Sequence, residues 1–431
     1  MSDCVDEELQ EEQSQILKHI RGRLDWLVSM FFQKIKSLYN NRHSNNVVRR
    51  TKLRRTMSDD LHEELVAEIL KRLPVKSLLQ CRSVCKSWYA LITNPSFVSL
   101  HLAHTTEANK PYSLVIKDCI PVSINPKKPQ FVLHNDDVSF SEYKQLDSSY
   151  VGFFTYVNFV GSSNGLICFL APKKGLIVWN PAIGAFITTS LCEICKETYS
   201  VFGFGFDRKN NDYKVVRIVY ALLDASFPSF AEIFQLSSNS WKSTVTLKNL
   251  DYDVNSIGSC VELNGVFHWF ARMRNGTKKT IASLNLSNEA IQELMLPHAL
   301  AESSNRGCCL TVYNESLAAI DYRGFSTEQF AYLRCSIWVM KEYGAAESWT
   351  KQFTIDLQNH GGIGSVLSFQ ENGRILIKVS RNQIASYDPR TQRVTPIGVC
   401  EDFFEVHSYM ESLVLLGGKR NNSMVKTSIE E

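Results

Sequence analysis

The stretch KRLPVKSLLQCRSVCKSWYALI, from Lys71 to Ile92, decides the fold of the first part of the chain. Its apolar residues recur at helical spacing, yet Pro74 interrupts them. A proline disfavours the α conformation in the residue before it and fits well in the first turn of a helix. The sequence therefore predicts that one helix ends before Pro74 and that another begins there.

The flanking residues extend this pattern to three short helices. Asp60 and Glu63 have the spacing of a capping box ahead of the first helix. The apolar stripe of that helix is Leu61, Leu65, Ile69 and Leu73. Ser83 is a candidate cap for the third helix, which should end at Asn94-Pro95. The side chains expected to add a last apolar contact beyond it are Phe97, Leu100 and Leu102.

These helices carry more large apolar side chains than one small core can enclose. A unit of about 45 residues lies near the lower limit for independent folding, and surplus apolar surface usually marks an interface. The covering surface could belong to the rest of the chain or to a separate polypeptide, and the pattern alone leaves both open. Cys81 and Cys85 lack the second pair of ligands that a zinc site requires, so we expect no metal there.

After about Lys110 the chain changes to short runs of β-branched and aromatic residues broken by turn residues. Examples are YSLVI (112–116), GLICFL (165–170), YKVVRIVY (213–220) and RILIKV (374–379). Strands at such short spacing predict an all-β sandwich, barrel or propeller.

A weak repeat favours the propeller. Hairpin-like segments centred near Asn180, Leu236, Asn285, Lys341 and Tyr387 follow one another at intervals of about fifty residues. This period is typical of the four-stranded blades of kelch-type propellers. We expect an irregular, kelch-like β-propeller of six or seven blades over residues 105–418, with a disordered tail at 419–431.

The N-terminal region has its own charge pattern. Residues 1–12 carry six acids, whereas residues 13–56 carry eleven Lys or Arg against the single Asp25. We expect residues 1–56 to be a partly disordered helical and basic extension. A membrane-surface helix, a coiled coil and a segment without a distinct role remain open for it. The basic linker at 47–56 is read as a nuclear-import signal, a weak nucleic-acid patch or a solvated linker, and no stable nucleic-acid complex is expected.

No signal for export or membrane insertion is visible. The chain opens with acids where a basic and then apolar leader would be needed, and no apolar run is long enough to span a bilayer. We therefore expect a protein of the cytoplasm, the nucleus or both, whose cysteines stay reduced.

The run from Leu61 to Leu102 closely resembles the F-box of plant F-box proteins in its core RLPVKSLL, its element RSVCKSW and its ending LITNPSFVSLHL. Downstream, GSSNGLICF (161–169), LIVWNPAIGAF (176–186) and GFGFDRKNNDYKVV (203–216) resemble the F-box-associated, kelch-like interaction domain of the same family. The resemblance implies a small all-α, three-helix F-box over residues 57–104, followed by the β-propeller domain.

In that family the F-box binds the Skp adaptor of a Skp-cullin-RING ubiquitin ligase, and the C-terminal domain binds the protein to be ubiquitinated. The resemblance implies a non-catalytic substrate-recognition adaptor that needs no cofactor and no metal. The adaptor-facing residues that it implies are Leu61, Leu65, Ile69, Leu73, Pro74, Leu78, Val84, Cys85, Trp88, Leu91 and Ile92. Trp88 is expected to be an aromatic anchor and Cys85 a small buried thiol.

One position departs from the family. The usual opening Leu-Pro pair is Leu61-His62 here. Without the proline the unfolded chain keeps more conformational freedom, so docking could be weaker by about 1 kcal/mol.

Two other functions stay open: an enzyme built on the propeller, such as a hydrolase or oxidase, or a scaffold that binds Skp without joining a cullin complex. The Gly-rich stretches GFGFD and GGIGS lack the context of a phosphate loop, and their glycines fit blade turns and close strand packing. Cys192 and Cys195 are interpreted as ordinary loop thiols, and His101 and His104 as a solvated pair.

Overall fold

A computed structural model of the chain describes two compact units. One comprises residues 1–110 together with 411–431, and the other comprises residues 111–410. The described ranges are 63–108, 112–117, 128–137, 139–147, 157–171, 175–189, 198–221, 229–246, 250–252, 260–273, 279–301, 307–327, 331–370, 372–379, 383–399 and 404–414. The predictions for residues 1–56, Asp60, Leu61, His62, Cys192, Cys195 and the tail at 419–431 lie outside them.

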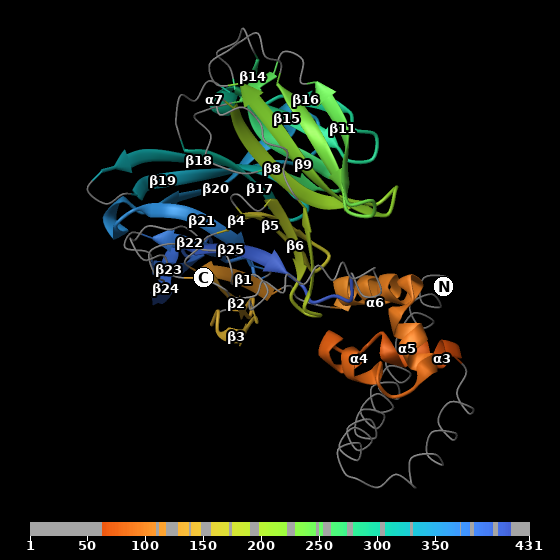
Figure 1. Ribbon diagram of the computed structural model, residues 1–431. Coiled ribbons are helices and arrows are strands. Elements are labelled where there is room, and N and C mark those ends of the chain that lie inside the picture. Colours follow the sequence, from red (N-terminus) through yellow and green to blue (C-terminus); the bar gives the residue numbers. More distant parts are fainter. Residues whose placement is uncertain are drawn as a thin grey trace, which may run out of the picture. The chain divides into compact units, whose positions relative to one another are not determined.

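The helical unit contains the three predicted helices. These are α3 (Glu63–Leu70), α4 (Val75–Cys81) and α5 (Lys86–Thr93), which Figure 1 shows close together. Pro74 directly precedes α4 with φ −58° and ψ 151°, an extended conformation that cannot continue α3. The helix boundary predicted at Pro74 is therefore confirmed, as is the end of α5 before Asn94.

A fourth helix, α6 (Pro95–Ala108), follows where only loose apolar contacts were predicted. Asn94 Oδ1 accepts a hydrogen bond from the Ser96 N–H at 2.9 Å, and Pro95 occupies the first helical position. A cap followed by proline starts a helix as effectively as it ends the previous one. The predicted boundary between residues 104 and 105 falls inside α6.

Ser83 does not cap α5, contrary to the prediction. Its hydroxyl donates to the Gln80 carbonyl at 2.7 Å and so satisfies the C-terminal end of α4. Cys85 occupies the N-cap position of α5 and makes no side-chain cap hydrogen bond.

The β unit consists of antiparallel sheets, which we number as blades in chain order. Blade 1 contains β25 (Phe404–Tyr409), β1 (Tyr112–Lys117), β2 (Gln130–His134) and β3 (Glu142–Gln145). Blade 2 contains β4 (Asn158–Ser163), β5 (Leu166–Ala171), β6 (Gly175–Asn180) and β7 (Ala185–Thr189). Blade 3 contains β8 (Thr198–Asp207), β9 (Asp212–Ala221), β10 (Phe230–Gln235) and β11 (Ser240–Thr246).

The remaining blades follow the same up-and-down order. Blade 4 contains β12 (Leu250–Tyr252), β13 (Val261–Leu263), β14 (Val266–Met273), β15 (Lys279–Asn285) and β16 (Ile291–Leu294), followed by the short α7 (His298–Ala301). Blade 5 contains β17 (Cys308–Tyr313), β18 (Ser316–Ser326), β19 (Ala331–Met340) and β20 (Trp349–Asp356), the last preceded by the 3₁₀ turn at Ala346–Ser348. Blade 6 contains β21 (Ile363–Phe369), which the 3₁₀ turn at Gln358–His360 precedes, β22 (Ile375–Val379), β23 (Gln383–Asp388) and β24 (Arg393–Val399).

The blades close into a ring. Neighbouring blades contact one another through β25 and β4, β4 and β8, β8 and β13, β13 and β17, and β19 and β21, and β21 contacts β25 again. Blades 5 and 6 are joined by the single paired position Tyr332 and Ile363, so they count as one sheet by hydrogen bonding and as two meanders by connectivity. Within the described ranges the ring thus has six blades, one of the two predicted numbers, and the C-terminal strand β25 completes the first.

The predicted repeat corresponds to one structural feature. The five segments near Asn180, Leu236, Asn285, Lys341 and Tyr387 are the outer hairpins that join the last two strands of blades 2 to 6. An outer hairpin can retain a local turn signal because its geometry depends mainly on its own residues.

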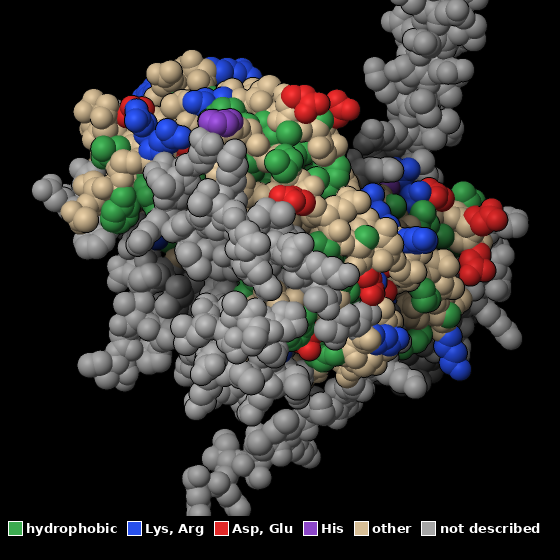
Figure 2. Space-filling model, turned by 90° about the horizontal axis from the view of Figure 1, so that it is seen from above, with side chains coloured by type: hydrophobic (Ala, Val, Ile, Leu, Met, Phe, Trp, Pro, Cys, Tyr) green, Lys and Arg blue, Asp and Glu red, His purple; other side chains and the backbone are tan. Residues whose placement is uncertain are grey.

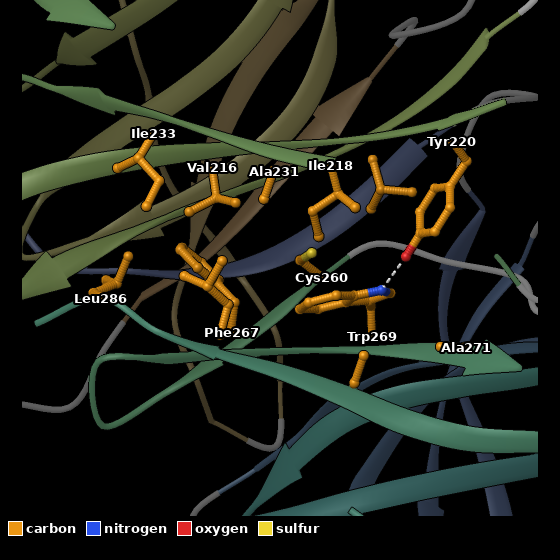
Figure 3. Close-up of a cluster of buried hydrophobic side chains, with 13 residues drawn as sticks. Val216, Ile218, Tyr220, Ala231, Ile233, Cys260, Phe267, Trp269, Ala271 and Leu286 are labelled. Carbon is orange, nitrogen blue, oxygen red and sulfur yellow. Dashed lines mark hydrogen bonds between the residues drawn. The ribbon is translucent and has the colours of Figure 1, made fainter. Parts of the chain in front are cut away.

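Apolar side chains from adjacent blades form the cores between them. Figure 3 shows the core between blades 3 and 4, in which Trp269 Nε1 donates a hydrogen bond to the Tyr220 hydroxyl. Gly203 lies on β8 in this core, where a Cβ would come within 2.8 Å of the Phe267 ring. This close approach confirms the strand-packing role predicted for the glycines of GFGFD.

Candidate functional site

The predicted partner-facing residues divide into two groups by burial. Those with at most 6% of their surface exposed are Ile69, Leu73, Leu78, Trp88 and Ile92. Leu65 is 50% exposed and Pro74 is exposed, whereas Val84, Cys85 and Leu91 are half-buried. The second group is accessible to a partner in this conformation, and the first supports it from beneath. That a partner contacts either group stays a prediction.

The exposure of the apolar stripe of α3 changes along the helix. Leu65 and Ile69 are four residues apart and so lie on the same face. Leu65 is nevertheless half-exposed, while Ile69 and Leu70 are buried. The N-terminal end of the stripe is therefore the part that presents apolar surface.

The buried thiol is Cys81 and not Cys85, contrary to the prediction. Cys81 lies three residues after Leu78 on the same face of α4, and both are fully buried. Burial raises the pKa of the Cys81 thiol to about 12, so the side chain behaves as a small apolar group. Cys85 stands in the extended residue before α5, half-buried, with Sγ 3.1 Å from the Ser87 hydroxyl.

His101 is buried, so the prediction of a solvated histidine pair is wrong for it. Its Nε2 donates to the Leu73 carbonyl at 3.0 Å, and its ring stacks on Phe97 one turn earlier on α6. Burial lowers the pKa of His101, which favours the neutral ring. The residue thus ties α6 to the end of the α3 segment, a role that could not be seen while α6 was missing from the prediction.

Two exposed apolar residues of the helical unit were not among the predicted partner-facing residues, and one of them, Leu100, was expected to make an apolar contact. Tyr89 is 51% exposed, with the Arg82 guanidinium 5.0 Å above its ring, and Leu100 is 37% exposed. Tyr89 follows Trp88 directly, and neighbouring residues on a helix point about 100° apart. A buried Trp88 therefore implies an outward Tyr89, which is the signal that could have identified it.

A buried charge cluster lies between blades 3 and 4. Lys214 Nζ is 2.9 Å from Asp207 Oδ2, and both side chains are at most 2% exposed. The same ammonium donates to the Leu286 carbonyl, and Ser287 donates to Asp207 at 2.7 Å. Because Leu286 and Ser287 follow β15, the cluster links the two blades. Its groups are satisfied by one another, which is typical of a structural ion pair.

The pKa of Asp207 shows the balance of forces in this cluster. Burial alone would raise it, but hydrogen bonds from Ser287, Asn210 and Lys214 outweigh burial and hold the pKa of the carboxyl well below its ordinary value. Asp207 therefore stays ionised beside Lys214.

The β unit exposes several large apolar side chains on different blades. They are Tyr143, Phe186, Met295, Phe325 and Tyr343. Among the coloured residues of Figure 2, hydrophobic side chains lie in small groups between polar atoms. The exposed apolar side chains that the structure describes thus lie on several blades and do not single out one of them as a recognition surface.

Within the described ranges no three His, Cys, Asp or Glu side chains are grouped so as to hold a metal ion. No described helix is long and apolar enough to cross a membrane.

Two family models match the chain. The F-box domain matches residues 58–100, and the F-box associated β-propeller domain matches residues 121–414, more than half of the chain. The former covers helices α3 to α5 and the start of α6, and the latter covers every strand of the blades from β2 to β25, leaving out only β1.

Known proteins of similar sequence carry the F-box in their names. The F-box protein At3g17490 of Arabidopsis thaliana is 29% identical over 77% of this chain and 83% of its own length. The F-box/kelch-repeat protein At3g23880 of the same plant is 28% identical over 68% and 78%.

A solved structure of a functionally unknown protein from Desulfotomaculum acetoxidans is similar over 69% of this chain and 99% of its own, with 8% identity and a TM-score of 0.37. A likeness of this size carries no argument. The domain matches and the observed order of helices and blades agree with each other: the chain belongs to the family of F-box proteins with an F-box associated β-propeller domain.

Proposed function

We propose that the protein is the substrate-recognition adaptor subunit of a Skp-cullin-F-box ubiquitin ligase. Its F-box binds the Skp adaptor, and its propeller binds the protein targeted for ubiquitination. The observation that carries this proposal is the presence, in one chain, of an F-box and an F-box associated propeller. The exposed apolar side chains of the helical unit, Leu65 and Tyr89, support it.

The contribution of such a subunit is proximity. A target held by the propeller and a conjugating enzyme held through Skp and a cullin become parts of one assembly. The reaction between them is then effectively intramolecular, which raises its rate without a catalytic group on this chain. We propose accordingly that the protein is not itself an enzyme and that it acts in the cytoplasm, the nucleus or both.

A substitution of Leu65 tests the docking step. Leu65 is half-exposed, so Leu65→Asp places a charge on the proposed interface without opening the helical core. Truncating a central interface residue typically costs about 2 kcal/mol or more, which corresponds to about a thirtyfold loss of Skp affinity. Trp88 is less suitable because it is buried, and its removal would disturb the fold.

The matched control is Met295→Asp, which adds the same charge at an exposed apolar side chain of the β unit. Purification of the three full-length chains from plant cells should recover Skp and cullin with the wild type and with Met295→Asp, but not with Leu65→Asp. Equal recovery with all three would reject the interface. Recovery of Skp without cullin would indicate a scaffold outside a ligase.

Target proteins can be sought with the same pair of chains. With the proteasome and cullin activation blocked, a target should be retained by the wild type and by Leu65→Asp alike, because only the helical unit is altered. Proteins lost together with Skp are ligase components and not targets.

A further inference from the structure

The chain returns to the helical unit after its last propeller strand. β25 ends at Tyr409, and residues from 411 onward group with the helices and not with the blades. The chain therefore passes between the two units twice, once near residue 110 and once near residue 410. The first passage leads into β1 and the second leaves from β25. These two strands are neighbours, because Tyr112 of β1 pairs with Tyr409 of β25.

The segment 411–414 is buried although it forms neither helix nor strand. Ser412 is 0% exposed, Leu413 is 1% exposed and Val414 is 9% exposed. The Val414 N–H donates to the Ser412 hydroxyl at 3.3 Å, which closes a local turn. Segments beyond the last strand of a domain are usually exposed unless they are packed down. Two buried apolar side chains therefore require an apolar surface that receives them.

The described part of the helical unit before the propeller is small. Its four helices span residues 63–108, near the lower limit at which a hydrophobic core alone sustains a fold. Additional apolar side chains from a distant segment would enlarge that core.

We propose that Ser412, Leu413 and Val414 complete the helical unit. This unit is then built from two segments, one before and one after the β-propeller in the sequence. An F-box fragment that stops at α6 would then be an incomplete unit. If the proposed docking to Skp holds, damage at the C-terminal segment would weaken docking by loosening the helices, without any change in an adaptor-facing residue.

Hydrogen exchange on three chains tests the proposal. One is the full chain, one ends at Val414 and one ends at Met410. The chain ending at Val414 should protect the amides of α5 and α6 as the full chain does. The chain ending at Met410 should exchange them about tenfold faster or more, while β1 and β25 keep their protection. Equal protection of the helices in the two shortened chains would overturn the proposal.

A point variant guards against effects of shortening. Leu413→Asp in the full chain buries a charge in the proposed contact and should speed exchange in α5 and α6, whereas Met295→Asp should not. If exchange rises in β1 and β25 as much as in α5 and α6, or in the strands alone, the segment does not act on the helical unit in particular, and the proposal fails. Faster helix exchange with unchanged Skp recovery would leave this inference standing and count against the proposed docking role.

Discussion

The buried ion pair between blades 3 and 4 allows a quantitative prediction. Lys214→Met removes the ammonium that lies 2.9 Å from Asp207 and donates to the Leu286 carbonyl. Asp207 is fully buried, so the substitution leaves a carboxylate without its counter-charge in the interior. Breaking a buried pair in this way typically lowers the free energy of unfolding by about 3–5 kcal/mol.

The hydrogen bonds that remain on Asp207 place the expected loss of stability at the lower end of this range. Asp207 keeps hydrogen bonds from Ser287 at 2.7 Å and from Asn210 Nδ2 at 2.7 Å after the substitution. We therefore expect a loss of about 3 kcal/mol. For a chain whose stability falls by about 3 kcal/mol per molar urea, the midpoint would drop by about 1 M.

Urea unfolding followed by the far-ultraviolet circular dichroism of the strands measures this loss. Arg374→Met is the matched control, because it removes the more accessible pair of Arg374 with Asp388 at 3.7 Å and should shift the midpoint much less. Adding Asp207→Asn to Lys214→Met should restore part of the stability, since the uncompensated charge is gone. The reasoning is refuted if Lys214→Met lowers the midpoint no more than the control.

Two further predictions concern the same blades. Gly203→Ala should lower the free energy of unfolding by about 1–3 kcal/mol, because its Cβ would lie 2.8 Å from Phe267; Gly398→Ala, with no atom within 4 Å, is the control in the same urea assay. Burial lowers the pKa of His268 to about 4, so the unfolded chain, whose histidine pKa is about 6.5, takes up the proton first. Stability from neutral His268 is complete above pH 6.5 and falls by about 2 kcal/mol between pH 7 and pH 5. A His268→Gln chain that loses as much over this range would contradict the assignment.

Local signals made much of the fold predictable. Pro74 and the pair Asn94-Pro95 mark helix boundaries because proline restricts its neighbours whatever the tertiary structure. The strands were recognisable from runs of β-branched and aromatic residues, and the outer hairpins from their recurring turns. Asn94 and Pro95 are also signals for the start of a helix, so the start of α6 was predictable from the same residues. The prediction took them only as the end of α5.

Burial within the candidate site was less predictable. The helical periodicity assigns the same burial to four apolar or small side chains: Leu65, Leu78, Cys81 and Cys85. Leu78 and Cys81 are buried, whereas Leu65 is half-exposed and Cys85 half-buried. The difference depends on how the helices pack against one another, which the periodicity of a single helix does not reveal.

Neighbouring residues alone account for the three short helices, the all-β character of the larger part and a repeat of about fifty residues, because each of these follows from interactions between residues close in the chain. Three other features became visible only in the folded chain: six blades close through β25, Asp207 and Lys214 join blades 3 and 4, and residues 411–414 group with the helices. These features bring together residues separated by up to hundreds of positions, and such pairings leave no periodic trace in a single sequence.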